Sequence, residues 1–187
     1  MIRAAGIRPG TPDPVRHKAR QIRLLLLDVD GVLTDGRLLY DFAGREFKQF
    51  HVHDGLGIHW LLRAGIEVGI VSGRASRAVE VRARELGLTI VLQGIQDKWA
   101  VVQSLLEKKQ LPASRAAFMG DDLVDLAVLR RVGLAIAVPN GHPQVRRMAD
   151  WVTRTAGGAG AVREAAELLL AAQGHWQRLL REARGKG

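Results

Sequence analysis

Four consecutive leucines, Leu24 to Leu27, end directly at the acidic triplet Asp28-Val29-Asp30. A short run that is apolar at every position is typical of a strand buried on both faces, because successive side chains of a strand point to opposite faces of its sheet. Sheets buried on both faces are mostly parallel sheets covered by helices. This feature therefore predicts an α/β fold with two carboxylates at the end of an inner strand.

The rest of the chain alternates between strand-like and helix-like patterns. Short apolar runs that end in Gly or Asp predict strands in residues 22–30, 66–73, 88–94, 115–122 and 133–138. Apolar residues at three- and four-residue spacing predict helices near residues 56–64, 75–86, 97–109, 123–131 and 160–173. The alternation predicts a Rossmann-like three-layer sandwich with a central parallel sheet and helices on both faces.

Two segments depart from this alternation. Residues 37–50 contain two short runs around an Ala-Gly turn, which predicts a β-hairpin that projects after the first strand. The glycine-rich segment from Thr155 to Ala161 is interpreted as a flexible joint before the last helix.

Composition limits the class of protein. With 187 residues, 47% of them hydrophobic, the chain can bury one full core, so one domain is expected. It has no cysteine, which excludes disulfides and thiolate metal sites and is typical of a reducing compartment. No run approaches the ~20 apolar residues of a membrane span. We expect a cytoplasmic protein with no membrane partner.

The formal net charge of +9 lies mostly near the two ends of the chain. Residues 1–20 carry five Lys or Arg against one acidic residue, and residues 174–187 carry four against one. These segments are interpreted as a basic flexible N-terminal tail, residues 1–20, and a basic C-terminal tail, residues 174–187, around one domain at 21–173. Neither tail interleaves aromatic with basic residues as single-strand binding requires, so no nucleic-acid partner is expected.

Polar side chains follow the predicted strands in four clusters. They are Asp28 with Asp30, then Ser72-Gly73-Arg74, then Lys98, and finally Asp121 and Asp122 with Asp125 beyond. Each cluster alone has a structural explanation, such as a helix cap or a surface lysine. The carboxyl ends of parallel strands meet at one edge of the sheet, so the four together predict a single site. Paired carboxylates after four leucines require a compensating cation or proton.

The order of these clusters resembles the haloacid dehalogenase-like phosphatases, and the resemblance spans Ile22 to Gln173. The pattern Asp-x-Asp-Gly-x-x-Thr-Asp at residue 28 comes first, followed by Ser-Gly-Arg, the lysine and Gly-Asp-Asp. The lack of a cap domain, the hairpin, "HVHDGLGI" and "GGAGAVREAAELLLAAQG" are most similar to the small capless phosphatases of 3-deoxy-D-manno-octulosonate 8-phosphate, an intermediate of lipopolysaccharide inner-core synthesis.

The resemblance implies a role for each cluster. Asp28 is the expected nucleophile, and Asp30 the expected acid and base. Mg²⁺ is expected on the Asp28 carboxylate, the Asp30 backbone carbonyl and Asp121. Ser72 and Lys98 are expected to bind the phosphoryl oxygens. The resemblance further implies two supporting residues, Asp122 and Asp125, of which the second orients the lysine. The expected substrate-binding residues are Thr34, His51, Val52, His53, Asp54, Gly55, His59, Gly73, Arg74, Arg82 and Lys98.

Two alternatives stay open. His59 stands where many relatives have arginine or lysine, so the substrate could be another acidic sugar phosphate, such as a nine-carbon 2-keto-3-deoxy acid 9-phosphate. A nucleic-acid-binding module on a degenerate phosphatase fold is the alternative of another class. The resemblance also implies a homotetramer with the hairpin at the interface, and the tail beyond Gly174 is a candidate lid for the site.

Overall fold

The computed structural model describes residues 10–185. Its sheet has six parallel strands in the order β5-β4-β1-β6-β7-β8. The strands are β1 (Leu24–Leu27), β4 (Glu67–Val71), β5 (Ile90–Leu92), β6 (Ala116–Gly120), β7 (Leu134–Ala137) and β8 (Trp151–Val152). Because β1 lies in the middle and the chain adds strands first on one side and then on the other, the strand order reverses between β1 and β6. Ligands of such sheets bind at the carboxyl ends of the strands beside that reversal.

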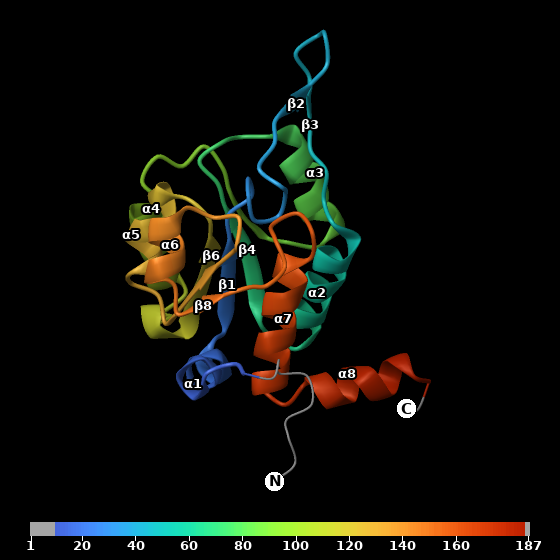
Figure 1. Ribbon diagram of the computed structural model, residues 1–187, viewed down its shortest axis with the longest axis vertical. Coiled ribbons are helices and arrows are strands. Elements are labelled where there is room, and N and C mark those ends of the chain that lie inside the picture. The colour runs from blue at the N-terminus through green and yellow to red at the C-terminus, as the bar shows by residue number, and fades with distance from the viewer. Residues whose placement is uncertain (1–9, 186–187) are drawn as a thin grey trace.

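The leucines of β1 divide between two apolar cores. Leu25 and Leu27 belong to the core that includes α1 (Asp13–Gln21), α2 (Val52–Arg63), α3 (Arg77–Glu85) and α7 (Ala161–Ala172). Leu24 and Leu26 belong to the core on the other face, with α4 (Lys98–Lys108), α5 (Leu126–Leu129) and α6 (Pro143–Met148). Figure 1 shows α2, α3 and α7 on one side of the sheet and α4, α5 and α6 on the other. The predicted three-layer α/β sandwich is confirmed.

The predicted hairpin is also present. Strands β2 (Leu39–Tyr40) and β3 (Glu46–Phe47) pair antiparallel, and Asp41 closes the connection by accepting hydrogen bonds from the amides of Ala43 and Arg45. Figure 1 shows the hairpin projecting from the end of the molecule at which β1 ends.

The prediction of a flexible N-terminal tail is wrong for the residues that form α1. Val15 and Ala19 are buried one helical turn apart, and Lys18 Nζ pairs with Asp150 Oδ1 at 2.5 Å. The basic residues of this segment therefore belong to the polar face of an amphipathic helix. Residues 1–9 of the predicted tail lie outside the described residues.

The predicted C-terminal tail contains another helix, α8 (Trp176–Ala183). Leu179 is buried, the Trp176 ring meets the Trp60 ring edge-on at 5.8 Å, and Glu182 pairs with Arg63 at 3.1 Å. Helix α8 lies at the end of the sheet away from the hairpin (Figure 1), so within one chain it does not cover the carboxyl ends of the strands as a lid. Residues 186–187 lie outside the described residues. No helix in the part of the chain that the structure describes is long and apolar enough to cross a membrane.

Candidate active site

A cleft of about 310 Å³ opens at the carboxyl ends of β1, β4 and β6. Eight residues that the sequence assigns to the site line it together with Gly36 and Val124. Those eight are Asp28, Asp30, Ser72, Gly73, Arg74, Lys98, Asp121 and Asp122. The four clusters, which are separated by up to nearly a hundred residues in sequence, thus meet in one place.

Lys98 joins two carboxylates beneath the cleft. Its ammonium lies 2.9 Å from Asp28 Oδ1 and donates to Asp125 Oδ1 at 2.7 Å. The lysine is 4% exposed and is the first residue of α4, whose amino end is capped by Asp97 through the amide of Ala100. Burial alone would lower the pKa of Lys98, but the charges of Asp28 and Asp125 outweigh it and raise that pKa. The lysine therefore carries a full positive charge at neutral pH.

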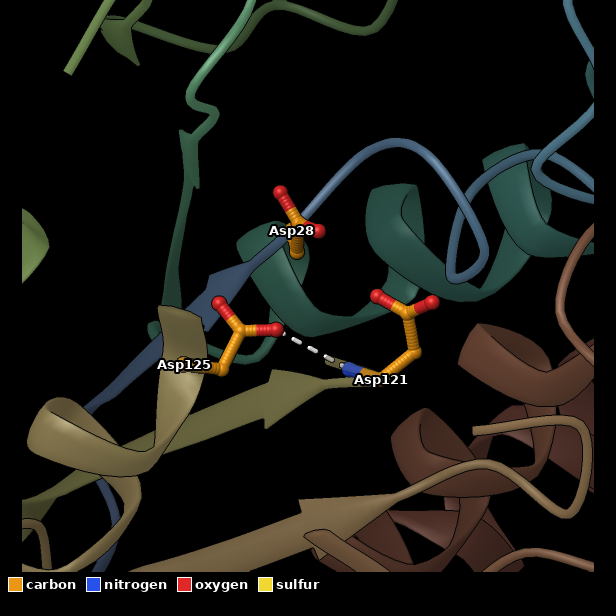
Figure 2. Close-up of side chains that lie close together, drawn as sticks. All are labelled: Asp28, Asp121 and Asp125. Atoms are coloured by element: carbon orange, nitrogen blue, oxygen red, sulfur yellow. Dashed lines mark hydrogen bonds between the residues drawn. The ribbon is translucent and has the colours of Figure 1, made fainter. Parts of the chain in front are cut away.

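Asp125 is fully engaged by the protein itself. Oδ1 accepts from Lys98, and Oδ2 accepts from the backbone amides of Asp121 and Asp122 at 3.0 and 3.3 Å. Figure 2 shows this carboxylate turned toward the backbone nitrogen of Asp121. Asp125 is completely buried, so it supports the lysine and the turn after β6.

Asp28 and Asp121 form a pair of carboxylates that is partly shielded from solvent. Burial raises the pKa of Asp28 to about 6, and the charge of Asp125 adds to this against the opposing charge of Lys98. Burial likewise raises the pKa of Asp121 to about 8, with further contributions from the charges of Asp28, Asp125 and Asp122. Like charges held this close in a partly dry site favour a proton or a cation between them.

The carboxylate oxygens of the cleft suit a small cation that prefers oxygen ligands. Carboxylate oxygens of Asp28, Asp121 and Asp125 all lie within 4.8 Å of one another. Both oxygens of Asp125 already accept hydrogen bonds from the protein. Gly31 passes so close that a Cβ there would lie 2.1 Å from Asp121 Oδ2, so the loop after β1 leaves room for that carboxylate only because residue 31 is glycine. Carboxylate oxygens in this number, completed by carbonyl and water oxygens, are the ligands that Mg²⁺ prefers.

Ser72 and Gly73 form the wall of the cleft that follows β4. Ser72 is 3% exposed, its amide donates to Leu92 O at 2.8 Å, and its Oγ accepts from the Arg74 amide at 3.3 Å. These bonds fix the turn that brings Ser72 into the wall of the same cleft as Asp28.

A charged network reaches the cleft from the hairpin. Lys48 Nζ donates to Asp30 Oδ1, and Arg74 Nε lies 3.4 Å from Asp30 Oδ2. Glu46 Oε1 accepts from Arg74 at 2.6 Å and lies 3.4 Å from Lys48 Nζ. Arg74 also donates to the Tyr40 hydroxyl at 2.9 Å. Sequence reasoning missed Lys48 and Glu46, because they belong to a hairpin that the strand pattern does not connect to the sheet edge.

The other predicted substrate contacts do not line this cleft within one chain. Thr34 is buried in the turn after β1, where its Oγ1 accepts from the Gly36 amide at 3.2 Å. His51 caps α2 by accepting from the His53 amide at 3.3 Å, so "HVHDGLGI" is already helical from Val52. Val52, His53 and His59 are exposed on this helix.

Asp54, Gly55 and Arg82 lie where α2 packs against its neighbouring helices, outside the cleft. Asp54 is 2% exposed and its Oδ1 accepts from the Arg163 amide at 2.7 Å, so it caps the amino end of α7 from a neighbouring helix. A Cβ at Gly55 would lie 2.3 Å from Arg82 Nη2, which shows how closely α2 and α3 approach. Arg82 pairs with Glu85 on its own helix at 3.2 Å.

The glycine-rich segment 155–161 is closely packed, and the prediction of a flexible joint is wrong. A Cβ at Gly157 would lie 1.7 Å from Gly31 O, and the Gly158 amide donates to Val32 O at 3.0 Å. Asn140 bridges both loops, donating to Gly31 O at 3.0 Å and accepting from the Gly157 amide at 2.8 Å. The glycines therefore allow this segment to support the loop that carries Asp30.

Comparison with known proteins finds relatives that are described as hydrolases or phosphatases. A family model described as haloacid dehalogenase-like hydrolase matches residues 88–164. The 3-deoxy-D-manno-octulosonate 8-phosphate phosphatase of Escherichia coli (strain B / BL21-DE3) is 48% identical over 172 residues, which cover 92% of this chain and 89% of that protein. The enzyme of the same description from Yersinia pestis is 44% identical over 161 residues, 86% of each chain.

Solved structures agree. The 3-deoxy-D-manno-octulosonate 8-phosphate phosphatase of Moraxella catarrhalis, in complex with magnesium ion, phosphate ion and KDO, superposes with a TM-score of 0.88 at 42% identity, over 90% of this chain and 97% of that chain. A cobalt-bound deoxy-D-mannose-octulosonate 8-phosphate phosphatase of Haemophilus influenzae gives a TM-score of 0.81 at 40% identity, over 84% and 92% of the two chains.

Proposed function

The chain belongs to the 3-deoxy-D-manno-octulosonate 8-phosphate phosphatases, a family of haloacid dehalogenase-like hydrolases, and on that premise we propose how its cleft acts. The enzyme is a Mg²⁺-dependent phosphatase that hydrolyses 3-deoxy-D-manno-octulosonate 8-phosphate to KDO and phosphate. One observation carries the assignment to this cleft: Asp28 and Asp121 have carboxylate oxygens within 4.8 Å of each other, and the buried ammonium of Lys98 lies 2.9 Å from Asp28. The reaction belongs to lipopolysaccharide inner-core synthesis, and we propose that it takes place in the cytoplasm.

Asp28 is the proposed nucleophile. Its carboxylate oxygen attacks phosphorus, and the bond from phosphorus to the sugar oxygen breaks while Asp30 gives that oxygen a proton. Asp30 then takes a proton from water as the water oxygen attacks phosphorus, which releases phosphate and restores the Asp28 carboxylate. This replaces one difficult displacement with two easier ones.

The phosphoryl oxygens need positive partners throughout both steps. Lys98 already lies 2.9 Å from Asp28, so its ammonium can meet an oxygen on the phosphorus that Asp28 attacks. The Ser72 hydroxyl at the opposite wall is the proposed second donor. Asp125 keeps the lysine in this place, and Asp122 is proposed to support the turn, because its Oδ1 accepts from the Leu123 amide at 2.7 Å.

Mg²⁺ is proposed to be held by the Asp28 carboxylate, the Asp30 backbone carbonyl and Asp121. When bound, Mg²⁺ supplies positive charge that offsets the negative charge on the phosphoryl oxygens during transfer. The raised pKa values of Asp28 and Asp121 support the assignment, because a cation in this place relieves their repulsion.

Recognition of the sugar acid is proposed to involve more than one subunit. Gly73 and Arg74 line the cleft, and the planar guanidinium of Arg74 suits a carboxylate. The remaining proposed sugar contacts lie outside the cleft within one chain and are Thr34, His51, Val52, His53, Asp54, Gly55, His59 and Arg82. We propose a homotetramer with the hairpin at the interface, supported by apolar hairpin side chains that are at least half exposed, Leu39, Phe42 and Phe47.

A panel of phosphate esters tests the proposed substrate. Purified protein with Mg²⁺ is given 3-deoxy-D-manno-octulosonate 8-phosphate, a nine-carbon 2-keto-3-deoxy acid 9-phosphate and a neutral hexose 6-phosphate, and phosphate release is followed. The highest kcat/KM is expected on the eight-carbon acid. A higher value on the nine-carbon acid would assign the second substrate, and tight, salt-sensitive DNA binding without turnover would indicate the nucleic-acid module.

A further inference from the structure

The base of the hairpin delivers a buried ammonium to the cleft. Lys48 follows β3, and its side chain is 2% exposed although the hairpin around it is largely solvated. Its charged partners are Asp30 on one side and Glu46 on the other. A buried ammonium is strongly destabilising unless it is paired, so this lysine depends on the two carboxylates and fixes them in turn.

Asp30 is thereby held through both of its oxygens. Lys48 occupies Oδ1, and Arg74 approaches Oδ2 at 3.4 Å from the turn after β4. Glu46 connects these two cations, because its Oε1 contacts both. The Asp30 side chain is still 21% exposed, so it stays open to the cleft while its direction is set.

We propose that Lys48 is a positioning residue for Asp30 in the leaving-group step, which makes the hairpin base part of the reaction apparatus. The inference rests on the proposed function of Asp30. A proton donor has to lie within about 2.6–3.2 Å of the oxygen that it protonates. Asp30 stands on the loop after β1, beyond the strand, so the loop alone leaves its side chain free to rotate. Lys48 removes this freedom by holding Oδ1, and Oδ2, whose contact with Arg74 is the longer one at 3.4 Å, is left to face the ester.

The proposal predicts a loss that depends on the leaving group. A sugar alkoxide is a poor leaving group and must receive the Asp30 proton while the bond to phosphorus breaks. The p-nitrophenolate ion leaves without a proton, so the first step on p-nitrophenyl phosphate does not need the acid, whereas the second step, in which Asp30 takes a proton from water, is common to both substrates. In a single turnover, a misplaced Asp30 therefore slows release of the sugar far more than release of p-nitrophenolate.

The test compares Lys48→Met, which keeps the length and removes the charge, with Lys48→Arg and with Arg45→Met. Arg45 lies on the same hairpin and pairs with Asp41, away from the cleft. General acid catalysis contributes roughly 10²–10⁴-fold, so we expect Lys48→Met to lower the single-turnover rate of sugar release from the best sugar phosphate of the panel at least thirtyfold. Its single-turnover rate of p-nitrophenolate release should fall less than threefold. Lys48→Arg should recover most of the loss, and Arg45→Met should match the wild type on both substrates.

A double-mutant cycle separates positioning from general damage. In an Asp30→Asn background, Lys48→Met should cause no further loss on the sugar phosphate, since the group that it positions is already gone. Mg²⁺ should raise the Tm of Lys48→Met by the same increment as the wild type, which reports an intact cation site. Glu46→Gln is a milder second variant with the same substrate selectivity expected. Equal single-turnover losses on both substrates, or a full additional loss in the Asp30→Asn background, would overturn the proposal.

The outcome is distinguishable from failure of the proposed function. If the eight-carbon acid is not the substrate, the same comparison is made with whichever sugar phosphate the enzyme prefers, because every alkyl phosphate needs the proton. If the wild type hydrolyses no phosphate ester, the proposed function fails first, and the positioning role falls with it.

Discussion

Lys98 Nζ donates to Asp125 Oδ1 at 2.7 Å, and both residues are almost completely buried. Lys98 begins α4, and Asp125 lies 27 residues later, in the turn after β6. The same carboxylate binds the amides of Asp121 and Asp122 through its second oxygen. One buried aspartate therefore fixes both Lys98, the proposed phosphate-binding cation, and the backbone of Asp121, a proposed metal ligand.

The first prediction concerns this aspartate. Asp125→Asn should lower the free energy of unfolding by about 3 kcal/mol, because it breaks a buried ion pair and turns an amide toward the Lys98 ammonium. The kcat should fall at least tenfold as the lysine loses its fixed position. Urea unfolding monitored by circular dichroism, with steady-state phosphate release, measures both. Asp13→Asn is the control and should change neither by more than a small fraction, because the Asp13 side chain is exposed on α1, at the end of the molecule away from the cleft. A stable, fully active Asp125→Asn would contradict this account.

The second prediction concerns pH and Mg²⁺. The folded-state pKa values of Asp28 and Asp121 are raised, to about 6 and about 8, so the folded protein holds protons that the unfolded chain has lost. The stability from these two groups is therefore present at low pH and declines as pH rises through these values. Mg²⁺ competes with the protons for the same oxygens.

Differential scanning fluorimetry at several pH values tests this behaviour. The increase in Tm caused by Mg²⁺ should be larger at pH 8.5 than at pH 6, and EDTA should abolish it. Asp121→Asn should remove most of the increase at both pH values. An increase that is independent of pH, or that survives in this variant, would show that the cation binds elsewhere.

The third prediction concerns the contact between two loops. Gly157→Ala should displace the Gly31 loop, because the added Cβ would lie 1.7 Å from Gly31 O. Overpacking of this kind costs typically about 1–3 kcal/mol. We expect a lower Tm and at least a tenfold lower kcat, since the displaced loop carries Asp30.

Gly174→Ala is the control for this variant. Gly174 has φ +82 and nothing within 4 Å of an added Cβ, so alanine there is strained in the backbone and meets no neighbour. The cost of roughly 1–2 kcal/mol is similar. Because Gly174 lies far from the cleft, kcat should stay at the wild-type value. Comparable kcat values for the two variants would indicate that the loops are not coupled.

The sequence predicts the sheet and its acidic edge well, because both depend on local pattern. The polar residues that interrupt apolar strands, such as Asp28, Ser72 and Asp121, all meet in the cleft. Lys98 also lies there, since it begins the helix that follows β5. In a parallel sheet the chain order alone places these residues at one edge.

The parts that the sequence did not predict depend on long-range packing. Lys48 has an exposed hairpin as its local context, and only the fold of the hairpin base buries its side chain against Asp30. Asp54 lies in a segment that resembles a substrate loop, but its carboxylate caps a helix that begins more than a hundred residues later. The basic character of α1 concealed the buried pair of Val15 and Ala19.

The nucleophile carries the central claim, and Asp28→Asn tests it most directly. The amide keeps the size of the side chain and loses the charge that attacks phosphorus. The measurement is phosphate release from 3-deoxy-D-manno-octulosonate 8-phosphate with Mg²⁺, for the wild type and for Asp28→Asn preparations with cooperative melting curves. We predict Mg²⁺-dependent turnover by the wild type and, for the variant, less than about a thousandth of that rate, in line with the loss of a covalent nucleophile. Turnover by the variant above a tenth of the wild-type rate would contradict the account.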